Sequence, residues 1–510
     1  MERRSLVLFE LSFALLALQA AHPLWAVAHP PLQDLPQHLA AVRILADHGD
    51  PALHFDAFYT IELGRTQYLA YYLVVAALAK LLGVVRANTL VLSAAIVGTP
   101  YAMRALLRAL GRDERAALFV LPLTWNAHLV LGFFNFVAAI PLALGGLALA
   151  VRLRAEWTRP RAVGLAIVAF VAFYTHVLPF AFLGLGAMAI LVGGTPRDTV
   201  RRLALLVPAG LAALGWMVSS PAGRATVNAA SGTSGTGPSP TFTPVGDAIR
   251  NAPGWLTDVL HGPRDDVYLA AFAVLVLLAV GLSAIEPSAG DPLATRARRV
   301  VAWLAPLALA GYFLAPESYD WIWPIAPRFP LLALVFLVPS LEVPKRAEGL
   351  VLAVAVAVLS VLSSNEIARA FTVFDQQEVG LVDEVFGTIP RGSKVVGLIF
   401  DRGSREVKFS PFLHYAAYEQ AVRGGAAMFS FADFPACPYR FREGNRPPRV
   451  PPRWEWTPEL VDPRRDLGWY DFALVRGGPG AIGAAPDRWE LQLERGPWRV
   501  YRRVGARASD

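Results

Sequence analysis

Long apolar runs and short polar breaks alternate along the chain from residue 5 to residue 362. The runs are about 16 to 23 residues long, close to the roughly 20 residues that a helix needs to cross the hydrocarbon core of a bilayer. The breaks between them are rich in arginine, or in proline and glycine. This pattern predicts a bundle of membrane-spanning helices that ends near residue 365.

The first apolar run, residues 5–27, follows two arginines and could be a signal peptide or a membrane anchor. The sequence Ala26-Val27-Ala28 has the small residues of a cleavage site. However, the run is longer than the roughly 7 to 15 residues of a signal-peptide core. We therefore expect an uncut first span, and in either case the next segment is exported.

Clusters of basic residues predict the topology, because Arg and Lys near the ends of spans stay on the cytoplasmic side. Beyond residue 115, each apolar stretch between two clusters is long enough for two crossings, so the turn between those crossings faces outward. The clusters lie at residues 3–4, 104–115, 152–161, 197–202, 296–299 and 345–346. The outward turns are residues 125–135, 174–179, 219–267 and 316–328.

This topology has about 11 spans, with 10 to 13 allowed, a cytoplasmic N terminus and an extracytoplasmic C-terminal region. Residues 67–103 contain two apolar stretches. Because this segment starts outside the membrane and ends inside, it crosses an odd number of times, and we expect one crossing. Residues 68–85, interrupted by Lys80, are therefore expected to form an interfacial helix on the outer membrane surface. Residues 219–244, rich in Ser, Gly, Thr, Ala and Pro, cannot bury a core and are expected to be mobile.

After residue 365 the pattern becomes that of a water-soluble domain. Short β-like runs at residues 394–400, 470–476 and 498–502, and a helical pattern at 411–423, indicate a small α/β domain with a Pro- and Arg-rich insertion at 446–453. The expected fold is thus an α-helical polytopic membrane protein over residues 1–364. An extracytoplasmic α/β domain follows over residues 365–510.

The amino-acid composition excludes several classes of protein and of site. Of the 510 residues, 55% are hydrophobic and 17% charged, which excludes an ordinary soluble enzyme. The net charge of +7 does not indicate nucleic-acid binding, because the arginines form short clusters between apolar runs rather than one basic face. The single cysteine, Cys437, excludes an internal disulfide framework and a cysteine-based metal site.

The first exported loop, residues 29–66, concentrates polar side chains and holds four of the nine histidines. Asp34 lies near the outer end of the first span, where partial desolvation suits a carboxylate that acts as a base near neutral pH. Because Asp34 precedes Leu-Pro at the start of a predicted helix, residues 36–46, the alternative is a helix N-cap. The other acids of the loop are expected to be solvated: Asp47, Asp50, Asp56 and Glu62.

No pair of histidines in this loop has the His-x-x-x-His spacing of one helical face, so no metal cofactor is expected. A divalent ion that bridges a phosphate remains an open alternative.

Polar residues at the outward turns complete the set of candidate substrate-binding residues. Ionisable groups in apolar spans are costly and usually functional, although at a span end they can simply snorkel to water. Arg328 precedes a late span, where its guanidinium could bind a phosphate or anchor the chain among interfacial tryptophans. The candidates are His38, His128, Asn135, His176 and Arg328.

Taken together, these features resemble the bacterial multi-span (GT-C) glycosyltransferase superfamily, such as protein O-mannosyltransferases and lipid A aminoarabinose transferases. The shared features are an acidic first exported loop, a basic residue in a later outward hairpin, a long outer loop and an outer C-terminal domain. By this resemblance, Asp34 matches the acidic residue of the family's first loop. Asn135 stands where many members have a second acid, and His176 where some have a phosphate-contacting lysine. Because Asn135 cannot be a base, the mechanism would depend on the first loop.

The resemblance implies that an inner-membrane enzyme of the bacterial cell envelope transfers a sugar from a polyprenyl phosphate to a glycan, lipid or protein acceptor. Asp34 would act as the base of an inverting reaction, while His176, Arg328 and His38 hold the departing phosphate. The bilayer and the lipid-linked sugar are the expected partners, with no nucleic acid. Two alternatives are a transporter or flippase for a lipid-linked saccharide and a non-catalytic envelope-assembly protein.

Overall fold

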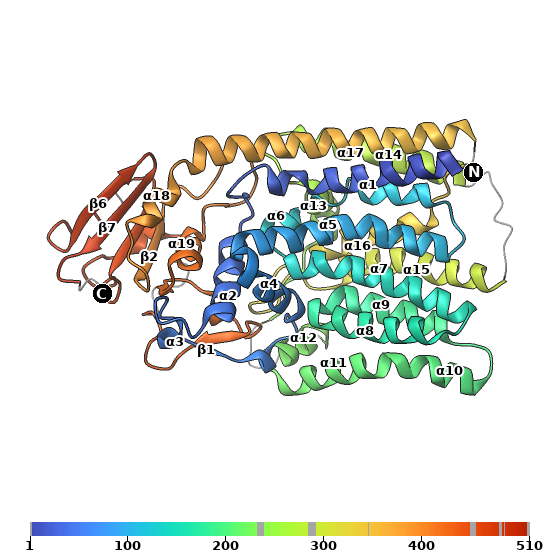
Figure 1. The fold of residues 1–510 in the computed structure, drawn as a ribbon, viewed down its shortest axis with the longest axis horizontal. Helices are drawn as coiled ribbons and strands as arrows, with labels where there is room; N and C mark the ends of the chain where they lie inside the picture. Colours follow the sequence, from blue (N-terminus) through green and yellow to red (C-terminus); the bar gives the residue numbers. More distant parts are fainter. Residues whose placement is uncertain are drawn as a thin grey trace.

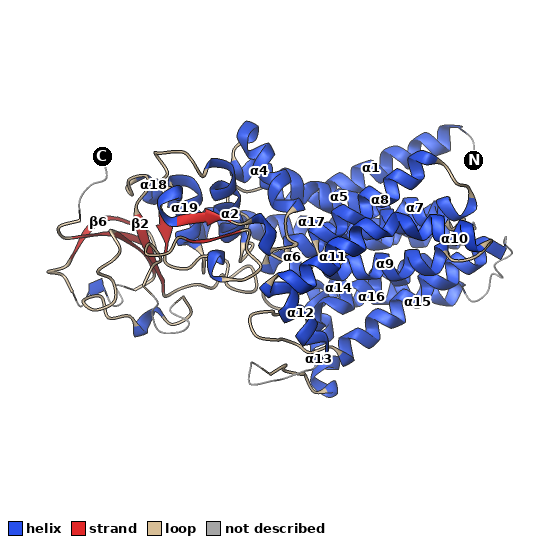
Figure 2. Cartoon of the chain, turned by 90° about the horizontal axis from the view of Figure 1, so that it is seen from below, coloured by secondary structure: helices blue, strands red, loops and turns tan. Residues whose placement is uncertain are grey.

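The computed structural model describes residues 3–231, 239–283, 292–344, 346–448, 455–478, 482–483 and 485–506. The molecule is elongated, with a helical bundle at one end and a β-sheet region at the other, and the chain termini lie toward opposite ends (Figure 1). Figure 2 shows the same separation of helices and strands from a second direction. The polytopic membrane fold with a C-terminal α/β region, as the sequence predicted, is confirmed.

Long apolar helices run alongside one another in the bundle (Figure 1). Seven described helical segments have the length and hydropathy needed to cross a bilayer. They are formed by α1 (Arg3–Trp25), α5 (Val84–Ala109), α7 (Phe134–Ala155), α10 (Pro196–Leu203) with α11 (Val207–Ser219), α14 (Arg264–Ser283), α15 (Pro292–Leu314) and α17 (Ala347–Val373).

Three shorter helices lie among the long ones: α8 (Arg159–Thr175), α9 (Val177–Leu191) and α16 (Phe329–Leu337) (Figure 1). They have 17, 15 and 9 residues. The sequence predicted about 11 spans because these apolar runs continue beyond the helix ends into turns and 3₁₀ segments.

Helix α4 (Ala70–Leu82) is separate from α5, because Gly83 between them adopts a positive φ of 76° that breaks the helix. With 13 residues, α4 is about 20 Å long, which is short of the roughly 30 Å hydrocarbon core. This length fits the interfacial helix expected over residues 68–85.

The predicted basic clusters meet at one end of the bundle, the end at which α1 begins (Figure 1). The guanidinium of Arg115 donates to the carbonyl of Pro344 at 2.8 Å, and that of Arg298 donates to the carbonyl of Leu110 at 2.8 Å. Arg104 pairs with Glu10 near the start of α1. The clusters from separate loops therefore share one side of the bundle, as the positive-inside pattern requires.

Short helices and turns connect the bundle to the opposite end of the molecule. Residues 221–231 form a helix, contrary to the expectation of a mobile segment, because Ala222 packs in a cluster with Trp216 and Phe173. Residues 232–238 lie outside the described part of that loop. The connecting helices are α2 (Leu35–Asp47), α3 (Phe55–Phe58), α6 (Ala127–Leu131), α12 (Pro221–Ser231) and α13 (Val245–Thr257).

The C-terminal region contains a five-stranded sheet in the order β3-β2-β5-β7-β6. Strand β2 runs parallel to β3 and β5, whereas β7 runs antiparallel to β5 and β6. The predicted runs correspond to β2, β5, β7 and α19. The elements are α18 (Val382–Gly387), β2 (Lys394–Ile399), α19 (Tyr415–Arg423), β3 (Ala426–Ala427), β5 (Phe472–Arg476), β6 (Trp489–Arg495) and β7 (Trp498–Arg503). The insertion expected at 446–453 lies largely outside the described residues.

The first exported loop and the C-terminal region share a second sheet. Strand β1 (Tyr59–Ile61) pairs antiparallel with β4 (Tyr439–Phe441). In addition, α17 runs past residue 365 to Val373 and continues as a π-helix over Phe374–Val379. No break in the backbone therefore marks the boundary between the bundle and the C-terminal region.

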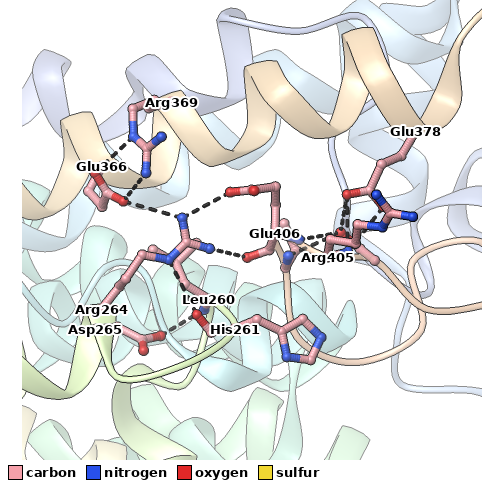
Figure 3. Close-up of polar contacts among 11 residues, drawn as sticks. Leu260, His261, Arg264, Asp265, Glu366, Arg369, Glu378, Arg405 and Glu406 are labelled. Carbon is pink, nitrogen blue, oxygen red and sulfur yellow. Dashed lines mark hydrogen bonds and ion pairs between the residues drawn. The ribbon is translucent and has the colours of Figure 1, made fainter.

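Charged side chains also join the C-terminal region to the bundle, as Figure 3 shows. Arg264, the first residue of α14, pairs with Glu406 at 2.9 Å and with Glu366 of α17 at 3.4 Å. Close to this contact, the carboxylate of Glu378 accepts a hydrogen bond from the backbone N–H of Arg405 at 3.0 Å. The loop before α19 is thus held against two membrane helices.

Candidate functional site

A cavity of about 330 Å³ lies where the bundle meets the C-terminal region. This volume is within the range of roughly 300–1,000 Å³ typical of small-molecule sites. The cavity brings together five of the six sequence-predicted residues, and His128 is the one candidate that does not line it. The polar residues that line it are Gln33, Asp34, His38, Tyr68, Tyr72, Asn135, His176, Arg328, His414 and Glu455.

Asp34 occupies the N-cap position of α2, but its side chain makes no capping hydrogen bond. The backbone around it is held instead by the turn after α6. The backbone N–H of Asp34 donates to the carbonyl of Leu131 at 3.2 Å, and that of Gln33 donates to the carbonyl of Val130 at 2.8 Å. The carboxylate, 18% exposed, is therefore free to contribute to the cavity.

Gly132 allows this close approach between Asp34 and the α6–α7 turn. Its φ of 103° lies in a region that residues with a side chain rarely adopt. A Cβ atom at Gly132 would lie 2.5 Å from the Cβ of Asp34. Only glycine fits here, and the backbone of the first exported loop passes directly against this turn.

The C-terminal region contributes His414 and Glu455 to the same wall of the cavity. The Nε2 atom of His414 lies 3.2 Å from Oδ1 of Asp34, and its Nδ1 atom forms a short contact with Glu455. Burial opposes the charge on His414, but the two carboxylates outweigh burial and raise its pKa to about 10. His414 is therefore an imidazolium between two carboxylates near neutral pH.

Arg328 lies at the other side of the site, in the 3₁₀ turn (Ala326–Arg328) that precedes α16. Its side chain is buried, its Nε has no partner, and it forms no ion pair with any residue that the structure describes. The guanidinium carbon lies 4.8 Å from the ring centroid of Phe133 and 5.9 Å from that of Phe136. A cation thus faces an aromatic wall without a counter-ion from the chain.

His176 forms the turn between α8 and α9, and its Nδ1 accepts a hydrogen bond from the backbone N–H of Leu178 at 3.1 Å. This contact assigns the proton to Nε2, because a ring nitrogen that accepts carries no hydrogen. Asn135, the second residue of α7, has an Oδ1 atom that is buried without a partner. Both residues therefore have unused hydrogen-bonding capacity at the cavity.

The other two histidines among the candidates use their ring nitrogens in contacts within the protein. His38 lines the cavity, but its Nε2 donates to the carbonyl of Gly132 at 2.8 Å and its Nδ1 accepts from the hydroxyl of Tyr72 at 2.8 Å. Burial lowers the pKa of His38 to about 4, so its ring is neutral. His128 binds the carbonyl of Pro327 at 3.0 Å and so supports the turn that carries Arg328.

Sequence reasoning missed two residues of this cavity, His414 and Glu455. His414 ends the short apolar run Pro411-Phe412-Leu413, and Glu455 lies between two tryptophans. Neither belongs to a motif, and both are far in sequence from the first exported loop. The aromatic lining from the C-terminal region was missed for the same reason: Phe429, Phe431, Phe434 and Trp456.

The remaining histidines of the first exported loop lie elsewhere. His29 contacts Asp375 at 3.0 Å and Asp383 at 3.3 Å, and these carboxylates outweigh the effect of burial and raise its pKa to about 9. His48 contacts the backbone carbonyl of Tyr59 at 3.0 Å. Among the described residues, no group of three His, Cys, Asp or Glu side chains is arranged to bind a metal ion.

Comparisons with known proteins bear on the fold. No protein-family model and no curated protein sequence matches the chain. Among solved structures, the chain is similar to ArnT from Cupriavidus metallidurans bound to undecaprenyl phosphate, with a TM-score of 0.52 and 11% sequence identity over 99% of both chains. The similarity therefore covers both the bundle and the C-terminal region. The chain therefore shares the fold of this neighbour along its whole length.

Proposed function

We propose that the protein is an inner-membrane glycosyltransferase that moves a sugar from a polyprenyl phosphate to an acceptor on the extracytoplasmic face. One observation carries this proposal. A single cavity contains Asp34, whose carboxylate makes no helix-capping hydrogen bond, and Arg328, a buried arginine without a counter-ion among the described residues. A base and an anion site are the two groups that such a reaction needs. The similarity to a protein bound to undecaprenyl phosphate supports the choice of donor.

The phosphate of the donor would bind at Arg328. A buried guanidinium without a carboxylate is costly, and a phosphate can satisfy it through charge-assisted hydrogen bonds. His176 would add a hydrogen bond from Nε2, since its Nδ1 is occupied by the backbone. The apolar lipid tail would lie along the bundle, because the cavity is at its rim.

Asp34 would act as the base. It would take the proton from an acceptor hydroxyl or amine while the acceptor attacks the anomeric carbon and the bond from that carbon to the phosphate oxygen breaks. The phosphate leaves as an anion and needs no general acid, so one carboxylate is sufficient, unlike the pair used in glycoside hydrolysis. A single displacement of this kind inverts the anomeric configuration.

The distribution of polar groups favours this function over transport. A transporter for a lipid-linked saccharide would place its polar site near the middle of the membrane, between broken helices of related halves. Here Asp34, Arg328 and His414 all line one cavity at the junction with the C-terminal region. The site has access to a lipid from the bilayer and to an acceptor from the aqueous side.

The test is the Asp34→Asn substitution, which keeps the shape of the side chain and removes the base. We expect transfer from synthetic undecaprenyl-phosphate sugars, measured in proteoliposomes as released undecaprenyl phosphate, to fall by at least about 100-fold. Binding of undecaprenyl phosphate should remain, since the phosphate site is intact.

The matched control is Asp56→Asn, which changes an exposed acid of the same loop. It should transfer sugar at the rate of the unmodified protein. Unchanged transfer in Asp34→Asn would reject the catalytic assignment. If the protein binds undecaprenyl phosphate but transfers sugar from none of the synthetic undecaprenyl-phosphate sugars, it would instead be a carrier or an assembly protein.

A further inference from the structure

The wall of the cavity opposite the bundle belongs to the C-terminal region, which supplies one cation next to Asp34. We propose that His414, held by Glu455, is a positioning residue whose contact with Oδ1 orients the Asp34 carboxylate as the base. This inference rests on the function proposed above. It assigns the C-terminal region a part in the reaction, beyond covering the site.

The position of His414 is fixed from three sides. It is the N-cap residue of α19, and its side chain is 5% exposed. Its ring stacks on Phe429 with centroids 5.3 Å apart and an interplanar angle of 10°. Glu455 contacts Nδ1, so Nε2 is directed at Asp34. A ring held in this way has little freedom to leave the carboxylate.

The charges around His414 favour the imidazolium. The two carboxylates that face it come from different parts of the chain, Asp34 from the first exported loop and Glu455 from the C-terminal region. His38 is the other titratable group that acts on it electrostatically, and the buried ring of His38 is neutral near pH 7. Burial raises the pKa of Glu455, while the imidazolium beside it acts in the opposite direction.

The two oxygens of Asp34 have different surroundings. Oδ1 faces His414 at 3.2 Å and the amide nitrogen of Gln33 at 3.5 Å. Oδ2 has no hydrogen-bond partner among the described residues. The proton of the acceptor would therefore move to Oδ2, while His414 keeps its own proton. After transfer, the nearby cation favours release of the proton from Asp34 to water, which restores the base.

The positive charge of His414 determines in which direction the pH profile of kcat/KM should move when His414 is replaced. A positive neighbour within about 4 to 6 Å stabilises an ionised carboxylate by the equivalent of roughly 1 to 3 pH units. Removing the charge from His414 removes this favourable interaction with the proposed base. The acidic limb of the kcat/KM profile should then move upward, and activity lost at pH 6 should return at higher pH.

His414→Gln is the principal test, because glutamine can still donate a hydrogen bond but carries no charge. We expect the acidic limb of kcat/KM to move up by about 1 to 3 pH units. Glu455→Gln should produce a smaller shift in the same direction, since it weakens the charge on His414 without removing the ring. His48→Gln, which changes a histidine bound only to a backbone carbonyl, should leave the profile unchanged.

A second measurement does not depend on transfer. In protein labelled with ¹³C-histidine, the signal absent from His414→Gln identifies His414, and its chemical shift should report an imidazolium at pH 8. Asp34→Asn and Glu455→Gln should each lower the pH at which this signal titrates. Undecaprenyl phosphate binding by each variant shows that it is folded.

The possible failures can be told apart. A neutral His414 at pH 8, or a loss of rate in His414→Gln that is equal at every pH, would overturn this inference while transfer by the unmodified protein stands. Absence of transfer in the unmodified protein would overturn the proposed function and the role of Asp34 as a base. In that case, an imidazolium that depends on Asp34 would show the ion pair to be structural.

Discussion

At the scale of single residues, the cavity contains polar atoms that the chain itself does not satisfy. Nε of Arg328 and Oδ1 of Asn135 are buried without partners among the described residues. A buried polar group without a hydrogen bond costs roughly 1 to 3 kcal/mol, and more if it is charged. Both atoms belong to residues that line one cavity, so a bound ligand with acceptor and donor groups would recover this cost.

Substituting Arg328 should weaken the binding of the phosphate. We expect Arg328→Gln to lower the affinity for undecaprenyl phosphate by about 10- to 100-fold, because a hydrogen bond to a charged group contributes roughly 1.5 to 3 kcal/mol. Arg328→Lys should recover part of the affinity, as lysine keeps the charge without the planar fork. Titration of the lipid into protein in nanodiscs measures both.

Arg224→Gln serves as the control for this substitution. Arg224 is exposed in α12, and its guanidinium donates to backbone carbonyls of the preceding turn. Its loss should leave lipid binding unchanged. Equal binding by Arg328→Gln and the unmodified protein would place the phosphate elsewhere.

The sequence singled out residues where a polar side chain interrupts an apolar segment, because charge and hydrogen-bonding capacity are unusual beside a span. Asp34, Asn135, His176 and Arg328 were chosen in this way, and all four line the cavity. Glu455 was not, since an acid in a polar segment is ordinary. The folding of the C-terminal region decides which of its residues reach the membrane surface. No local sequence pattern predicts this.

At the scale of elements, the α6–α7 turn determines where Asp34 lies. The first exported loop binds to this turn through backbone hydrogen bonds at Gln33 and Asp34, and His38 binds the carbonyl of Gly132. Because α2 starts at Leu35, a shift of the turn would move the whole helix. The turn therefore acts as the support of the proposed base.

Gly132→Ala should disturb this support. The added Cβ would overlap the side chain of Asp34, and alanine at a φ of 103° is strained by roughly 1 to 3 kcal/mol. We expect a lower Tm and a loss of transfer of at least about tenfold. Gly145→Ala, inside α7 with open space around it, should change neither property. Thermal unfolding in detergent and the transfer assay measure the two effects.

Element boundaries were harder to predict than the elements themselves. Strands β2, β5 and β7 were found because each is a short local run that contains apolar, β-branched or aromatic residues. The end of the bundle was placed at residue 364, but α17 continues to Val373 because polar residues can extend a helix beyond the membrane without breaking it. Strand β1 was missed, since a three-residue strand is defined only by its distant partner β4.

At the scale of the whole molecule, the two ends of the bundle have opposite characters. The basic clusters contact one another at the end where α1 begins, and the cavity lies at the end that joins the C-terminal region. From this arrangement, the positive-inside rule predicts that the cavity lies on the extracytoplasmic face.

Cysteine labelling tests this orientation. In a Cys437→Ser background, Ser239→Cys should react with an impermeant thiol reagent added to intact spheroplasts. Arg197→Cys, in the basic end, should react only after lysis. Both positions are exposed, so access to the reagent depends on the side of the membrane. Labelling of Ser239→Cys only after lysis, with labelling of Arg197→Cys in intact spheroplasts, would show that the topology is the opposite one.

The joining of the first exported loop to the C-terminal region has a consequence for biosynthesis. The amide of Gln37 binds the backbone of Phe429 and Phe431, partners that are 392 and 394 positions away in the chain. Ribosomes add about 5 to 20 residues per second, so the loop emerges from the translocon well before Phe429 and Phe431 are made. A nascent or truncated chain would reach the bilayer with its spans inserted but with the cavity incomplete. The proposed activity would therefore require the C-terminal region to be synthesised and folded.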